Sequence, residues 1–201
     1  MNLLKINANS PDPALIGQAA STLRAGALAV LPTDTVYGLG VALQADEGRQ
    51  ALYRVKGRDA DKAIPVLIAS PDTLGELATQ LPAYAYDLAR RFWPGPLTLV
   101  VRAARSMPPA WCASDGSVAL RMPACAVTLA LIRAVEGPLA VTSANRQGQA
   151  PASTVATLDP LIAAQVDLII DSGPVALGIS STVVSCLHAE PQVLRSGALG
   201  L

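Results

Sequence analysis

Residues 27–40 read ALAVLPTDTVYGLG, an apolar run that passes directly into a polar, glycine-containing cluster. The run over 27–31 predicts a buried strand, because it is continuously apolar, and Pro32 ends it. The cluster over 32–40 holds two threonines, an aspartate, a tyrosine and two glycines, which let a backbone approach a ligand closely. The stretch therefore indicates either a binding loop at the end of a strand or an ordinary turn rich in Thr and Gly.

Outward from this stretch, apolar runs alternate with helical patterns, which predicts an α/β domain. We expect one domain over residues 1–201, built on an open, twisted, mixed sheet flanked by helices, since no repeat or composition break marks a second one. The expected strands are 3–6, 27–31, 64–68, 97–101, 118–122, 139–142, 168–170, 182–185 and 192–194. The expected helices run from Ser10-Pro11-Asp12 to Gly26, from Asp46 to Lys56-Gly57, from Pro71, from Pro82 to Phe92, over 127–135 and over 154–164.

The composition excludes several functional classes. The 201 residues are 51% hydrophobic and carry no formal net charge, which argues against a protein that coats nucleic acid but leaves room for a local basic groove. No apolar run of about 18 residues predicts a membrane span, and no signal peptide is apparent, so we expect a cytoplasmic protein. The three cysteines and single histidine predict no disulfide framework, no metal site and no Ser-His-Asp triad.

Lysine is rare in this sequence, and most of it lies in one short stretch. Two of the three lysines, Lys56 and Lys62, flank Arg58 in one short window. Such a group suits a phosphate or carboxylate, although Lys and Arg also favour an ordinary solvated helix end. The window is not a Walker A loop, and no GxGxxG precedes a helix.

Polar side chains also follow the expected strands. Arg121 and Arg195 close apolar runs, Ser143 and Asn145 follow the run over 139–142, and three adjacent hydroxyls lie within 178–182. Ser143 lacks a GxSxG setting and an adjacent base, so we interpret it as a ligand-binding group and not a nucleophile. Each cluster alone also fits a plain turn or a surface residue. Together they indicate a site that handles a polyanion and an amino acid by positioning and electrostatics.

The motifs PTDTVYGLG, KGR, FWPGPLT, ALRMP, TSAN, SST and LRSG occur in an order and spacing that resemble the YrdC-like family, from about Leu15 to Gly197. The resemblance implies an open α/β sheet with a large concave cavity. It also implies synthesis of threonylcarbamoyl-AMP and pyrophosphate from L-threonine, bicarbonate and ATP. That product serves threonylcarbamoyladenosine modification at position 37 of tRNA.

The resemblance also implies roles for individual residues. It assigns catalysis to Lys56, Arg58, Ser143 and Asn145; ATP binding to Arg58, Lys62, Ser117, Ser143 and Arg195; and threonine binding to Thr35, Arg121, Val141 and Ser181. Mg²⁺ would arrive with ATP, and tRNA and a threonylcarbamoyl transferase complex are candidate partners of a monomer or dimer. The sequence departs from common family residues at Asp59, Leu67, Cys125, Gln147 and Pro151.

Two alternatives accompany this interpretation. The first is a YrdC-like paralogue without synthase activity that binds double-stranded or structured RNA on its concave face. The second is the carbamoyl-phosphate-handling relative found within hydrogenase maturation proteins. The second is disfavoured because its zinc-finger and acylphosphatase segments are missing from this sequence.

Overall fold

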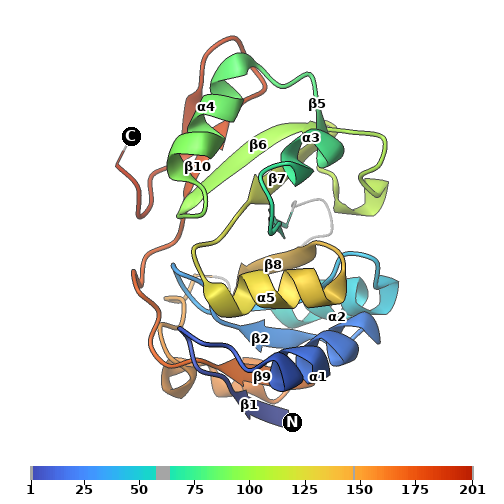
Figure 1. Ribbon diagram of the computed structural model, residues 1–201, viewed down its shortest axis with the longest axis vertical. Coiled ribbons are helices and arrows are strands. Elements are labelled where there is room, and N and C mark those ends of the chain that lie inside the picture. Colours follow the sequence, from blue (N-terminus) through green and yellow to red (C-terminus); the bar gives the residue numbers. More distant parts are fainter. Residues whose placement is uncertain (1, 58–63, 147, 201) are drawn as a thin grey trace.

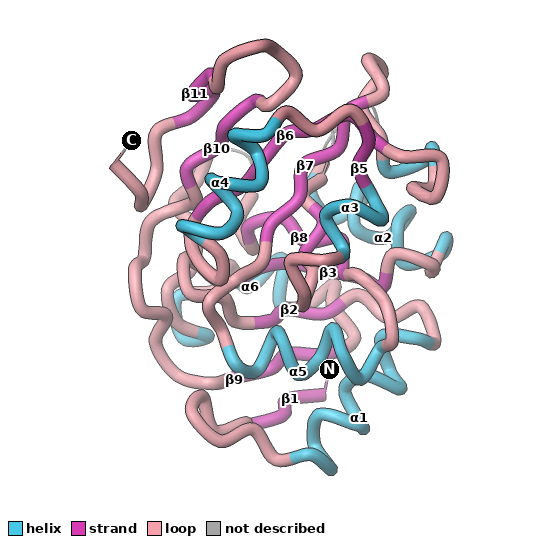
Figure 2. Tube along the Cα trace, turned by 45° about the horizontal axis from the view of Figure 1, so that its top comes forward, coloured by secondary structure: helices cyan, strands magenta, loops and turns pink. Residues whose placement is uncertain are grey.

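The computed structural model describes residues 2–57, 64–146 and 148–200, and its strands form one open, mixed sheet (Figures 1 and 2). The order of the paired strands is β1-β9-β2-β3-β8-β4-β7-β6-β10-β11, with β5 paired to β6. Their bounds are β1 (Asn2–Lys5), β2 (Ala29–Leu31), β3 (Gly38–Ala42), β4 (Val66–Leu67), β5 (Ala78–Thr79), β6 (Leu97–Ala103), β7 (Ser117–Arg121), β8 (Leu139–Ser143), β9 (Leu168–Asp171), β10 (Thr182–Ser185) and β11 (Gln192–Arg195). The expected fold class is confirmed.

The helices divide the apolar core into two clusters. Their bounds are α1 (Pro13–Arg24), α2 (Asp46–Lys56), α3 (Thr73–Leu77), α4 (Ala83–Phe92), α5 (Ala126–Val135) and α6 (Pro160–Ala163), with 3-10 turns η1 (Pro109–Trp111) and η2 (Val155–Thr157). Helices α1 and α5 lie side by side and share one cluster with β1, β2, β8 and β9. Helices α2, α3, α4 and α6 contribute to the other cluster. In the described residues, no helix is long and apolar enough to cross a membrane.

A short strand joins the two parts of the sheet. Strand β4 pairs in parallel with β7 and antiparallel with β8, through only Val66 and Leu67 on each side. Pro65 stands immediately before this strand, as expected of a proline that starts a strand, and the strand is shorter than the predicted 64–68. In Figure 1, β6, β7 and β10 with α3 and α4 lie above this junction, and β2, β8 and β9 with α1 and α5 lie below it.

Alternation along β6 and β7 gives each of these strands one face toward the core and one toward a cavity. In β6, Leu97, Leu99 and Val101 point into the core, whereas Thr98 and Val100 line a cavity. In β7, Val118 and Leu120 are core residues, and Arg121 lines the same cavity. Successive side chains of a strand point to opposite faces, so the period of two both packs the core and aims residues into the cavity.

Two local predictions were wrong. Residues 38–42 form β3, whereas the cluster over 32–40 was interpreted only as a loop. The glycines at positions 38 and 40 do not suggest a strand from the sequence, but the fold requires them, because a Cβ at Gly38 would lie 2.4 Å from the Val141 side chain.

The single helix expected over 154–164 is instead η2 followed by α6. Pro160 cannot continue a helix interior, and the Asp159 carboxylate caps the new helix by accepting the Leu161 N–H at 2.9 Å.

Candidate active site

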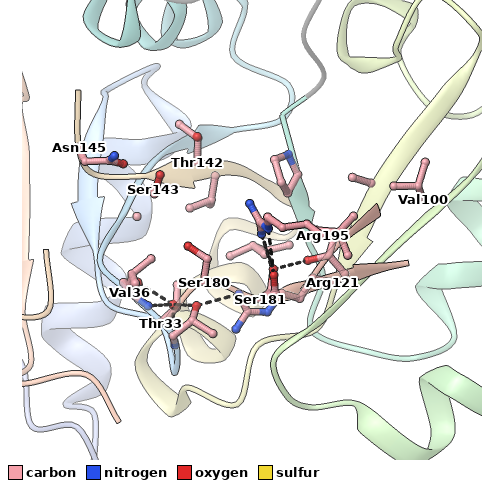
Figure 3. Close-up of a pocket in the computed structure, with 18 of the residues that line it drawn as sticks. Thr33, Val36, Val100, Arg121, Thr142, Ser143, Asn145, Ser180, Ser181 and Arg195 are labelled. Carbon is pink, nitrogen blue, oxygen red and sulfur yellow. Dashed lines mark hydrogen bonds between the residues drawn. The ribbon is translucent and has the colours of Figure 1, made fainter. Parts of the chain in front are cut away.

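A cavity of about 530 Å³ lies between the two parts of the sheet joined by β4 (Figure 3). Hydroxyls, an amide and three cationic side chains line it, and none of the described lining residues is Asp or Glu. The lining residues are Thr33, Thr35, Val36, Gly38, Lys56, Pro65, Leu67, Thr98, Val100, Ala119, Arg121, Val141, Thr142, Ser143, Asn145, Ser180, Ser181, Val183 and Arg195. This lining suits an anionic ligand that carries hydroxyl or amino groups.

Arg121 is held at the end of β7 by three segments of the chain. Its Nε donates to the Gly95 carbonyl at 3.0 Å, Nη1 donates to Thr35 Oγ1 at 2.9 Å, and Nη2 forms an ion pair with Asp34 Oδ1. The Arg121 side chain is 7% exposed. Burial lowers its pKa, the Asp34 carboxylate opposes that shift, and the neighbouring Arg195 adds to it. Three of the five guanidinium N–H groups are thus used, which leaves one on each terminal nitrogen for a ligand.

The turn that follows β2 presents hydroxyls beside this arginine. Thr33 Oγ1 donates to the Val36 carbonyl at 2.6 Å and lies 2.9 Å from Thr35 Oγ1. Thr33 Oγ1 also accepts the N–H groups of Thr35 and Val36, both at 3.1 Å, so either hydroxyl can be the donor between the two threonines. Thr35 Oγ1 accepts from Arg121 Nη1 at the wall of the cavity, which places this hydroxyl within reach of a ligand.

The second hydroxyl cluster comes from the strands on the far side of the cavity. Ser181 Oγ lies 2.8 Å from Thr98 Oγ1, and Arg195 Nη2 donates to the Ser181 carbonyl at 2.8 Å and to its Oγ at 3.2 Å. Figure 3 shows Arg195 above Ser181, next to Arg121. Thr182 Oγ1 holds the C-terminal segment by accepting the N–H groups of Gly197 and Leu199, both at 3.0 Å.

A substitution at Gly197 tests how tightly the C-terminal segment packs against residues 180–182. A Cβ at position 197 would lie 2.3 Å from the Ser180 carbonyl oxygen, so Gly197→Ala is expected to push the C-terminal segment away from Ser181. We expect overpacking to lower the free energy of unfolding by about 1–3 kcal/mol, measured by urea denaturation. Gly200→Ala is the matched control, because a Cβ there meets nothing within 4 Å. Equal stability of the two variants would contradict the packing argument.

Lys56 forms the third part of the site. The lysine ends α2, where Gly57 takes the left-handed conformation with φ 56°. Its Nζ donates to the Ser143 carbonyl at 2.9 Å and to the Asn145 carbonyl, and lies 3.4 Å from Asn145 Oδ1. A buried ammonium therefore shapes the turn after β8 that carries Ser143 and Asn145 into the cavity.

The structure brings together most of the predicted site residues. Eight of them line one cavity: Thr35, Lys56, Arg121, Val141, Ser143, Asn145, Ser181 and Arg195. Arg58 and Lys62 lie outside the described residues, as do Asp59 and Gln147. Ser117 is not among the lining residues: it is buried at the opposite end of β7 from Arg121, and its N–H donates to Asp115 at 2.9 Å. The geometry gives the predicted ATP contact of Ser117 no support.

Some residues of the site were not anticipated. Thr98, within the FWPGPLT motif, faces Ser181 from β6, and Asp34 is the ion-pair partner of Arg121. The period-two alternation of the 97–101 strand could have placed Thr98 opposite its apolar neighbours. No sequence signal pairs Asp34 with Arg121, because the two are 87 residues apart.

The fold and the cavity define a class: an open α/β protein with a cavity suited to a small anionic ligand where the two parts of the sheet meet. The comparisons with known proteins make this class specific. The family model for Sua5, YciO and YrdC, described as "Telomere recombination", matches residues 21–197. The chain belongs to this family.

Several relatives carry the name threonylcarbamoyl-AMP synthase. The Pyrococcus abyssi protein is 38% identical over 91% of this chain, and the Bacillus subtilis protein is 38% identical over 97%. The chain covers 54% and 56% of those two proteins, about half of their length. A Mycobacterium tuberculosis relative is 40% identical over 90% of this chain, which covers 83% of that protein.

Solved structures agree with the fold. The crystal structure of P. abyssi Sua5 complexed with L-threonine has a TM-score of 0.90 and 34% identity, covering 98% of this chain and 58% of that one. The Escherichia coli YciO structure has a TM-score of 0.86, covers 98% of this chain and 96% of that one, and shares 24% identity, so it supports the fold alone.

Proposed function

We propose that this protein is a threonylcarbamoyl-AMP synthase that forms its product and pyrophosphate from L-threonine, bicarbonate and ATP. The observation that carries the proposal is the hydrogen bonding of Arg121. Its buried guanidinium lies at the wall of the cavity and keeps one N–H on each terminal nitrogen for a ligand. Two such N–H groups match the two oxygens of a carboxylate. The L-threonine bound by the P. abyssi relative supplies a carboxylate of this kind.

The threonine subsite would be formed by the residues around Arg121. Arg121 would bind the carboxylate, and Thr35 and Ser181 would contact the amino and hydroxyl groups. Val141, in the floor from β8, would supply apolar contact for the substrate methyl group. A site that hydrogen-bonds a substrate hydroxyl strongly rejects analogues without it, which would favour threonine over amino acids that lack a hydroxyl.

The ATP subsite would use Lys56, Ser143, Asn145 and Arg195, together with Arg58 and Lys62 as the sequence predicts. The amine of threonine would add to CO₂ derived from bicarbonate and lose a proton, which gives a carbamate. A carbamate oxygen would then attack the α-phosphorus of ATP, and pyrophosphate would leave with the electron pair of the broken P–O bond. Cationic side chains would stabilise the charge on the phosphates, which is the main requirement of such a transfer.

Further components belong to the same proposal. Mg²⁺ would be carried by the ATP phosphates and water, since the described lining residues include no carboxylate for it. We propose that the enzyme is a nucleotidyltransferase that acts in the cytoplasm as a monomer or dimer. Its product would pass to a threonylcarbamoyl transferase complex for tRNA modification.

One assay tests the function directly. The protein is incubated with ATP, L-threonine and bicarbonate, and pyrophosphate and the adenylate are followed. We expect pyrophosphate release that depends on both threonine and bicarbonate. A protein that releases none would refute the synthase, and binding of structured RNA in its place would support the paralogue alternative.

The predicted phosphate role of Arg58 is tested in the same assay. Arg58→Ala is expected to lower the rate of pyrophosphate release by about 100-fold, because it removes a positive charge that the sequence assigns to phosphate binding. Arg105→Ala, at an exposed position away from the cavity, is the control and should retain the wild-type rate. A fully active Arg58→Ala enzyme would show that this arginine has no phosphate role.

A further inference from the structure

Asp34 is a buried carboxylate at the candidate threonine subsite that does not line the cavity. Its side chain is 5% exposed, Oδ1 pairs with Arg121, and Oδ2 has no hydrogen-bond partner among the described residues. The Asp34 main chain is engaged as well, because its carbonyl accepts the Leu177 N–H at 3.0 Å. A buried carboxylate with an unused oxygen is unfavourable for folding, so its retention calls for a reason in function.

The charges around the cavity indicate that reason. Lys56, Arg121 and Arg195 are the cationic side chains among the described lining residues, and no acidic residue lines the cavity with them. Asp34 contacts Arg121 from behind the cavity wall and brings the charge of that pair to zero. The guanidinium therefore offers two N–H donors to a carboxylate without presenting an uncompensated positive charge to the rest of the ligand.

This balance matters because an amino acid differs from other carboxylates by its ammonium group. An unpaired arginine would attract any carboxylate and would repel the ammonium a few ångströms away. With Asp34 behind it, the arginine still binds the carboxylate, and the aspartate offsets the repulsion of the ammonium. The Thr35 hydroxyl lines the cavity next to Arg121, which puts a polar group beside the ammonium of such a ligand.

We propose that Asp34 is a specificity-determining residue, which makes this site select a zwitterionic amino acid over a simple carboxylate anion by neutralising Arg121 from behind the cavity. The inference rests on the proposed function, since it takes L-threonine as the ligand of Arg121. Asp34 acts through Arg121 and has no contact with the substrate of its own.

The test compares two ligands by titration calorimetry: L-threonine and the hydroxy acid in which a hydroxyl replaces the amino group of threonine. Asp34→Asn removes the charge and keeps an oxygen that can accept from Arg121 Nη2. We expect the wild-type preference for threonine over the hydroxy acid to fall by about tenfold or more in this variant. Asp167→Asn is the control, because Asp167 Oδ2 accepts the Leu28 N–H at 2.9 Å away from the cavity, and its preference should equal that of the wild type.

Two results would overturn the proposal. One is an unchanged ligand preference in a folded Asp34→Asn protein. The other needs no variant: wild-type protein that binds the hydroxy acid as tightly as L-threonine. If the wild type neither binds threonine nor releases pyrophosphate, the proposed function itself fails. An active synthase with an unchanged preference in Asp34→Asn refutes only the role of Asp34.

Discussion

Replacing Arg121 with methionine is expected to abolish threonine-dependent pyrophosphate release and to lower the free energy of unfolding by about 3–5 kcal/mol. Activity is expected to be lost because, in the proposed site, the carboxylate of threonine would lose both of its N–H donors. The stability falls because Asp34 is left as a buried charge without a partner, and the Gly95 carbonyl and Thr35 lose a donor. Activity is measured by pyrophosphate release and stability by urea denaturation.

A second substitution separates the two effects. Adding Asp34→Leu to Arg121→Met replaces the buried ion pair with apolar side chains, an exchange that is often neutral or stabilising. We expect the double variant to regain most of the lost stability and none of the activity. Recovery of threonine-dependent activity in the stable double variant would show that Arg121 does not bind the substrate.

Replacing Lys56 with methionine is expected to lower kcat/KM for ATP by about 100-fold or more. The ammonium holds the carbonyls of Ser143 and Asn145, so its loss should release the turn that carries both side chains into the cavity. It also removes a positive charge from the proposed phosphate subsite. The uncompensated carbonyl oxygens should cost about 1–3 kcal/mol of stability each where they stay buried.

Two further variants show which property of Lys56 matters. Lys5→Met changes an exposed lysine on the edge strand β1 and should leave both kinetics and stability unchanged. Lys56→Arg keeps the charge but changes the geometry of the donors, so it should retain stability better than Lys56→Met while still binding ATP more weakly. Wild-type ATP kinetics in Lys56→Met would rule out both roles.

The strand pattern of this chain was largely predictable, and the exceptions have local causes. The apolar runs at 97–101 and 118–122 predicted β6 and β7 closely, because a buried strand needs little beyond continuous apolar residues. Strand β3 was missed because glycine has low strand propensity, and its glycines are needed to admit the Val141 side chain. The single helix expected over 154–164 was wrong because its apolar pattern runs through Pro160, which cannot lie in a helix interior and begins α6 instead.

The candidate site was predicted as a set of residues but not as an arrangement. Motif order alone indicated Thr35, Arg121 and Ser181 as partners in one pocket, and the structure places all three on its wall. The same resemblance assigned an ATP contact to Ser117, which lies at the start of β7 and is not among the residues that line the cavity. Position along a strand decides such a case, and a motif does not specify it.

The sequence by itself determined the class of the fold, the family and the residue types of the site, because apolar periodicity and local motifs are properties of neighbouring residues. Only the tertiary structure decided which of these groups form ion pairs and hydrogen bonds with each other. Arg121 meets Asp34, and Lys56 meets Ser143 and Asn145, across separations of 87 to 89 residues. Those contacts depend on how β2, β7, α2 and β8 are brought together around the short strand β4. The strand pairing of the whole sheet sets that arrangement, and no local sequence pattern specifies it.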